Sequence, residues 1–61
     1  MNVKTYAPAP APGQPNARQA KKIAHKLGLT DLTLNRNGIW NGYDNQLNLI
    51  KITPEMVQQL G

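Results

Sequence analysis

The feature that most constrains this chain is one complete helix signal in residues 16–28, NARQAKKIAHKLG. Asn16 can accept a hydrogen bond from a free amide of the first turn, and Gln19 can bond back to the Asn16 amide, which makes a capping box. Gly28 stands where a helix commonly ends in a left-handed residue. Between these caps, apolar residues recur at helical spacing: Ala17, Ala20, Ile23, Ala24 and Leu27. We therefore expect an amphipathic helix of about three turns.

The outer side of this helix is basic. Four of the chain's seven Lys and Arg residues lie between positions 18 and 26, off the apolar stripe: Arg18, Lys21, Lys22 and Lys26. With only three acidic residues, the chain has a formal net charge of +4. Clustered positive charge favours a partner that carries negative charge, either nucleic acid or an acidic protein surface.

The N-terminal segment differs in composition from the rest of the chain. Residues 7–15, APAPAPGQP, hold four of the five prolines, and alternating Ala-Pro favours an extended conformation over a helix or a central strand. We expect residues 1–15 to be a flexible Ala/Pro-rich arm and residues 16–61 to be one small basic binding domain. Residues 1–6, MNVKTY, either belong to that arm or add an edge strand.

The segment after the first helix fits two structures. The alternation of residues 32–34, followed by the turn signal Asn37-Gly38, predicts a β-hairpin. The same letters fit a short helix over residues 31–37, with Thr30 as its N-cap and Gly38 as its C-cap. The sequence leaves both interpretations open.

The C-terminal part predicts a strand followed by a short helix. Residues 46–52, QLNLIKI, have apolar side chains on both faces, which is typical of a central strand or one covered on both sides. Thr53 can cap a helix that begins at Pro54. The expected fold class is therefore α+β: a small single domain with an amphipathic N-terminal helix, a β-hairpin or three-stranded antiparallel sheet and a short C-terminal helix, preceded by the arm.

The hydrophobic core of such a domain must be small. It is expected to come from these residues or a subset of them: Ile23, Leu27, Leu29, Leu32, Leu34, Ile39, Trp40, Leu47, Leu49, Ile50, Ile52, Val57 and Leu60. Trp40 is expected to anchor this core, and the alternative is that Trp40 and Tyr43 form an exposed contact surface.

Residues 23–36, IAHKLGLTDLTLNR, resemble the helix-turn-helix of bacterial and phage transcription regulators. Ala24 is small where two helices approach each other, Gly28 stands at the turn, and Thr30 caps the place where the second helix would begin. The resemblance spans residues 20–39 and implies a non-enzymatic, DNA-binding transcription regulator that dimerises for specific binding. The residues it implies at the DNA are Arg18, Lys21, Lys22 and Lys26 on phosphates, and Asn35 and Arg36 on bases.

The second hypothesis is a protein-binding regulator. In size, charge, lack of cysteine and possession of an N-terminal arm, the chain is similar in general character to short phage-encoded proteins that bind host RNA polymerase. That resemblance implies inhibition of transcription by occlusion or by displacement of a factor. The contact residues it implies are Val3, Lys4, Tyr6, Arg18, Lys22 and Trp40.

The sequence contains no recognisable pattern of catalytic residues. Its acids are the scattered Asp31, Asp44 and Glu55, and its single imidazole, His25, has no second metal ligand near it. We therefore expect no enzyme activity, no metal site, no cofactor and no small-molecule substrate. No apolar run reaches the length of a signal peptide or a membrane span, so we expect a cytoplasmic protein, in the host cytoplasm if it is phage-encoded, without a membrane partner.

Overall fold

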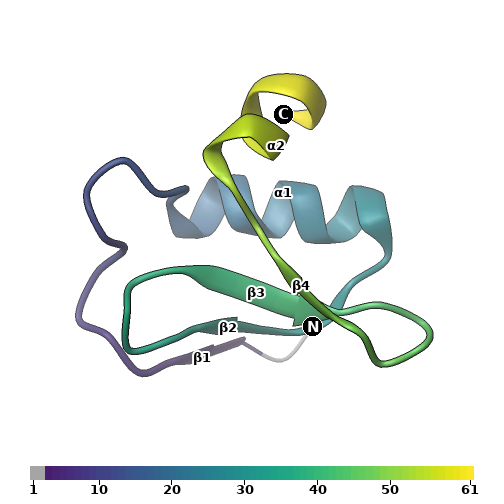
Figure 1. The fold of residues 1–61 in the computed structure, drawn as a ribbon, viewed down its shortest axis with the longest axis horizontal. Coiled ribbons are helices and arrows are strands. Elements are labelled where there is room, and N and C mark those ends of the chain that lie inside the picture. The colour runs from purple at the N-terminus through teal and green to yellow at the C-terminus, as the bar shows by residue number, and fades with distance from the viewer. Residues whose placement is uncertain (1–2) are drawn as a thin grey trace.

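The computed structural model describes residues 3–61. Along the chain the elements are β1 (Val3–Thr5), α1 (Ala17–Leu27), β2 (Thr30–Leu34), β3 (Trp40–Tyr43), β4 (Leu49–Lys51) and α2 (Pro54–Leu60). The strands form one mixed sheet in the order β1-β2-β3-β4, and both helices lie on the same side of it (Figure 1). β1 is parallel to β2, whereas β2, β3 and β4 are antiparallel to their neighbours. The predicted α+β class is confirmed, with a fourth strand beyond the three expected.

α1 has the caps that its sequence predicts. The Asn16 side chain accepts a hydrogen bond from the Gln19 amide at 2.8 Å, and the Gln19 side chain accepts one from the Asn16 amide at 2.9 Å. Gly28 ends the helix in the left-handed conformation, with φ of 68°. Ala20, Ile23 and Ala24 are completely buried. This side of α1 therefore packs on the sheet.

The segment after α1 is a strand. β2 pairs with β1 on one side and with β3 on the other, and its alternation buries Leu32 and Leu34. Two neighbouring strands satisfy its backbone groups, and its Thr and Asp residues are weak helix formers. The hairpin interpretation is thus confirmed, and the short helix over residues 31–37 is wrong. The second helix of the helix-turn-helix, which the resemblance over residues 20–39 implies, is not formed.

The turn between β2 and β3 depends on Asn35 and Gly38. The Asn35 side-chain oxygen accepts hydrogen bonds from the amides of Asn37 and Ile39, at 2.9 and 3.2 Å. Gly38 has φ of 79°, which glycine adopts without steric cost. The turn signal at Asn37-Gly38 is therefore used as the sequence predicts.

The N-terminal segment lies against the domain. β1 adds to the sheet as an edge strand, and the amide of Tyr6 donates to the Leu34 oxygen at 2.8 Å. The amide of Ala11 donates to the Gly38 oxygen at 2.9 Å, and Pro15 is buried. Backbone hydrogen bonds thus join the N-terminal segment, which the sequence assigns to a flexible arm, to β2 and to the turn between β2 and β3. Residues 1 and 2 of that segment lie outside the described residues.

β4 differs from its expectation. It lies at the edge of the sheet, and Leu47 belongs to the preceding turn, where it is 78% exposed. The expectation of a central strand or one covered on both sides is therefore wrong. The buried core is a subset of the expected residues together with two alanines: Ala20, Ile23, Ala24, Leu29, Leu32, Leu34, Trp40 and Ile52. Leu27, Leu47 and Leu49 are exposed instead.

Trp40 is the largest fully buried side chain, at 2% exposed. Its expected role as core anchor is confirmed, and the alternative of an exposed contact is wrong for this residue. α2 begins at Pro54 as predicted, with the Thr53 hydroxyl accepting from the Met56 amide at 3.2 Å. Its half-buried apolar residues pack against the same core: Met56, Val57 and Leu60.

Gly38→Ala is expected to destabilise the fold more than Gly28→Ala. Both glycines have positive φ, so each substitution carries a backbone cost of about 1 kcal/mol. Only the Gly38 methyl would meet another segment, because its carbon would lie 2.5 Å from the Ala11 nitrogen. Urea unfolding should give an additional loss of about 1 kcal/mol or more for Gly38→Ala. Equal losses for the two variants would contradict the packing of residues 7–15 on the hairpin.

Candidate functional site

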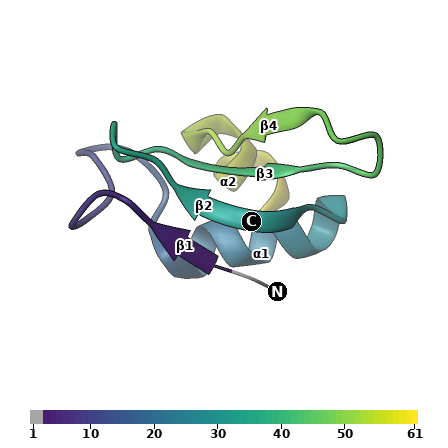
Figure 2. The same ribbon diagram turned by 90° about the horizontal axis from the view of Figure 1, so that it is seen from below.

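The face of the sheet opposite the helices is open. Figure 2 shows it in front of α1 and α2, and within residues 3–61 no helix covers it. The strand register forms one row across this face, in which Lys4 lies beside Thr33, Thr33 beside Asn41, and Asn41 beside Lys51. The row therefore has a lysine at each edge of the sheet and two polar side chains at its centre.

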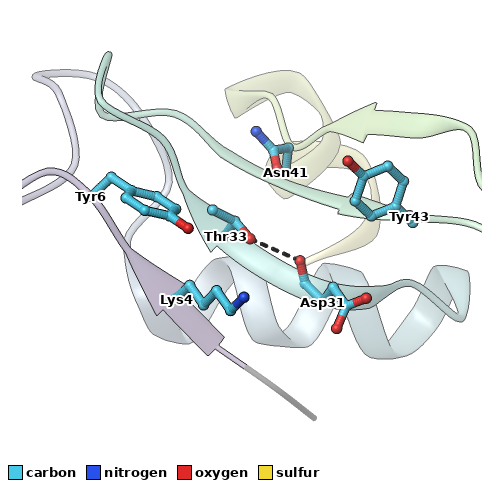
Figure 3. Close-up of a pocket in the computed structure, with 6 residues that line it drawn as sticks. All are labelled: Lys4, Tyr6, Asp31, Thr33, Asn41 and Tyr43. Carbon is cyan, nitrogen blue, oxygen red and sulfur yellow. Dashed lines mark hydrogen bonds between the residues drawn. The ribbon is translucent and has the colours of Figure 1, made fainter.

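An open cleft of about 330 Å³ lies on this face, a size at the lower end of ligand-binding clefts (Figure 3). The residues that line it are Lys4, Tyr6, Asp31, Thr33, Asn41 and Tyr43. Tyr6 and Tyr43 stand on opposite sides, and Thr33 and Asn41 lie between them (Figure 3). The cleft thus combines two aromatic walls with a polar floor.

The two tyrosines leave much of their surface in contact with solvent. Tyr6 is 57% exposed and Tyr43 is 38% exposed. Leu49, the β4 partner of Tyr43 in the register, is exposed as well. Aromatic rings that stand on an open sheet face are available to stack on a planar ligand.

Asp31 reaches the cleft through an irregularity in β2. The pairing with β3 shifts register between Thr30 and Thr33, and Asp31 has φ of 53°. Aspartate tolerates this left-handed conformation better than most residues, and a bulge re-aims the side chain that it contains. The Thr33 hydroxyl donates to the Asp31 carbonyl oxygen at 3.0 Å (Figure 3). The bulge therefore brings a carboxylate to the rim of the cleft.

The basic residues of α1 lie on the other side of the molecule, since the sheet separates α1 from the open face. The Lys22 ammonium donates to the main-chain oxygen of Gly61 at 2.9 Å, and the Lys26 ammonium donates to that of Leu60. These lysines satisfy oxygens at the C-terminal end of α2, where positive charge is favourable. Arg18 and Lys21 are exposed. The structure brings none of the four to the cleft.

The two residues expected to contact bases occupy the turn between β2 and β3. The Asn35 side chain is engaged within that turn, and Arg36 is exposed beside it. Their expected base contacts required the second helix, which is not formed.

The residues expected for protein binding are dispersed. Val3, Lys4 and Tyr6 lie on or next to β1, whereas Arg18 and Lys22 lie on α1. Trp40, the remaining member, is in the core. The sequence pointed to Lys4 and Tyr6, and to Tyr43 as an exposed contact in one alternative, but it did not bring them together. Four further residues of this face were not predicted to join them: Asp31, Thr33, Asn41 and Lys51. The available signal was the alternation of polar and apolar residues along β2, which separates Thr33 from its buried neighbours.

The turn beside Tyr43 is held by Asp44. Its carboxylate accepts from the amides of Asn48 and Gln46, at 2.9 and 2.8 Å. The hydrogen bond from the Asn48 amide, with that from Gln46, lowers the pKa of Asp44 below its ordinary value. This turn fixes the ends of β3 and β4 on which Tyr43 and Leu49 stand.

No protein-family model, no curated protein and no solved structure matches this chain. Within the described part of the chain, neither helix has the length and apolarity needed to cross a membrane. Residues 3–61 also contain no group of three or more His, Cys, Asp or Glu side chains that could hold a metal ion.

Asp44→Asn is expected to reduce the acid sensitivity of the fold. Because the folded pKa of Asp44 is lowered, its stabilisation is complete above the unfolded value of about 3.9 and is lost as the pH falls through the lower folded value. Urea unfolding from about pH 6 down to about pH 2 should therefore show a smaller decrease for Asp44→Asn than for the parent chain. Asn48→Ala keeps both main-chain donors and should retain most of the parent decrease. Identical pH profiles for Asp44→Asn and the parent would contradict this role.

Proposed function

We propose that this protein is a small, non-enzymatic nucleic-acid-binding protein that binds a single strand on the open face of its sheet. One observation carries the proposal: Tyr6 and Tyr43, from separate parts of the sequence, flank one cleft on that face. The lysines at the two edges of the sheet, Lys4 and Lys51, add charge that complements phosphate.

Stacking explains why a single strand fits better than a duplex. Every base has a π-face, and stacking on an aromatic side chain contributes about 1–3 kcal/mol per base. The bases of a duplex are already stacked on each other, so their faces are not available to Tyr6 and Tyr43. Three spacings between adjacent strands span about 14 Å from β1 to β4, which is enough for a few nucleotides.

The regulatory part of the function is a prediction from the sequence. Control of transcription, cytoplasmic residence and the lack of enzyme activity are expectations that this proposal keeps. The nucleic-acid contacts are proposed on the sheet and not on a recognition helix, because residues 30–34 form β2 and the second helix of the expected motif is not formed.

Removing both edge lysines is expected to weaken single-strand binding and its dependence on salt. For Lys4→Gln with Lys51→Gln, the slope of log K against log salt should fall by about 0.7 for each lysine. The matched control is Arg18→Gln with Lys21→Gln, which removes the same charge from α1. Fluorescence anisotropy of a labelled single-stranded oligonucleotide measures the Kd and its salt dependence for both double variants. A larger loss of affinity for Arg18→Gln with Lys21→Gln would contradict the assignment of binding to the sheet.

Tyr43→Leu is expected to weaken binding while it keeps an apolar side chain beside Leu49. Loss of one stacked base corresponds to a Kd higher by about 5- to 150-fold. Tyr6→Leu should have an effect of the same order, since the two rings form opposite walls. An unchanged Kd for both variants would show that the bound strand does not stack in the cleft.

A second candidate function is protein binding through the turn between β3 and β4. Leu47 is 78% exposed and has φ of 63°, a conformation that costs a leucine about 1 kcal/mol or more. With exposed Leu49 it forms an apolar tip, of the kind that anchors protein interfaces. RNA polymerase or another protein with an acidic surface is the class of partner expected from the sequence.

Leu47→Gly tests this second candidate. The glycine relieves the backbone strain, so urea unfolding should give equal or higher stability, by up to about 1 kcal/mol. Anisotropy should give an unchanged Kd for a single strand, because Leu47 does not line the cleft. Biolayer interferometry on immobilised RNA polymerase should detect the parent chain and give a weaker signal for the variant. No signal for the parent chain would remove RNA polymerase as the partner.

A further inference from the structure

Asn41 is a buried polar side chain that lines the cleft. It is 9% exposed. None of the side-chain hydrogen bonds within residues 3–61 involves its amide. Neither side-chain polar atom of Asn41 is among the fully buried atoms of the described residues that lack a hydrogen bond, so the amide remains accessible to solvent. The Asn41 amide therefore has a donor and an acceptor available to a ligand that enters the cleft.

Asp31 and Thr33 present hydrogen-bond acceptors to the cleft, whereas the Lys4 ammonium, also in the lining, is a donor that the proposed function places on phosphate. The Thr33 hydroxyl uses its proton on the Asp31 carbonyl oxygen, so its own oxygen can only accept from a ligand. The Asp31 carboxylate, also in the lining, is an acceptor as well when ionised. A ligand with an amino group satisfies these acceptors, whereas a ligand with carbonyl oxygens at the same place is repelled.

We propose that the cleft is a base-selecting subsite, which takes one unstacked base with an exocyclic amine in preference to thymine or uracil. This inference rests on the proposed function. The amine of cytosine or adenine donates to Asp31, and the Asn41 amide pairs with the donor and acceptor atoms on the edge of the base. Thymine and uracil place a carbonyl oxygen where cytosine has its amine, so the acceptors of Asp31 and Thr33 oppose them. Tyr6 and Tyr43 hold any base by stacking and do not discriminate.

Cytosine and thymine form the sharpest comparison, because they have similar size and differ in the groups that the cleft distinguishes. Fluorescence anisotropy is measured with labelled oligodeoxycytidine and oligothymidine of equal length, about twelve nucleotides. The quantity compared is the selectivity ratio, which is the Kd for oligothymidine divided by the Kd for oligodeoxycytidine. The parent chain is expected to bind the cytidine strand tighter by about tenfold. Tight binding of both strands with a ratio near one would overturn the inference and leave the proposed function standing. Binding of neither strand at low salt would overturn both.

Two variants identify the selecting residues. Asp31→Asn supplies an amide that can donate to thymine, so the ratio is expected to fall toward one through tighter thymidine binding. Asn41→Leu removes the pairing amide, so the ratio should fall through weaker cytidine binding. Lys51→Gln is the control, because it should weaken both strands equally. An unchanged ratio in Asp31→Asn, whose side chain is exposed, would overturn the inference whatever the behaviour of Asn41→Leu.

Discussion

The packing of α1 on one face of the sheet is the contact on which both the fold and the candidate site depend. The stripe of Ala20, Ile23 and Ala24 is completely buried in one core with Leu32 and Trp40. Within residues 3–61 these side chains form one core, and no helix of this part of the chain covers the opposite face of the sheet. Because side chains alternate along a strand, the pairing that buries Leu32 places Thr33 and its cross-strand partners, Lys4 and Asn41, on the open face.

The helices could be predicted from the sequence because their signals are local. Asn16 with Gln19, and Thr53 with Pro54, define two helix starts within a few residues each, and both starts are where the structure has them. The secondary structure of residues 30–34 could not be predicted in this way, because these residues are compatible with either a helix or a strand. The pairing partners of β2 settle the choice, and one of them, β1, comes from residues that precede α1. The strand preference of residues 1–6 allowed an edge strand, but nothing in the local pattern indicates that it pairs in parallel with β2.

The candidate site was only partly predictable, for a similar reason. Tyr6 and Tyr43 are far apart in the sequence and become neighbours of one cleft only through the sheet register. The basic cluster of α1, in contrast, is obvious in the sequence. Two of its members, Lys22 and Lys26, contact the C-terminal end of α2. Charge density along a chain does not distinguish a lysine that caps a helix from one that binds a partner.

An amide chemical-shift titration of the ¹⁵N-labelled protein with a single-stranded oligonucleotide at low salt tests directly whether the open face binds nucleic acid. We expect the largest shifts at Tyr6, Thr33 and residues 41–43 on that face. Shifts at Arg18 and Lys21 should stay small, because α1 lies on the side of the sheet opposite the cleft and neither residue lines the cleft. Shifts concentrated on α1, or no shifts at all, would contradict the assignment of nucleic-acid binding to the open face.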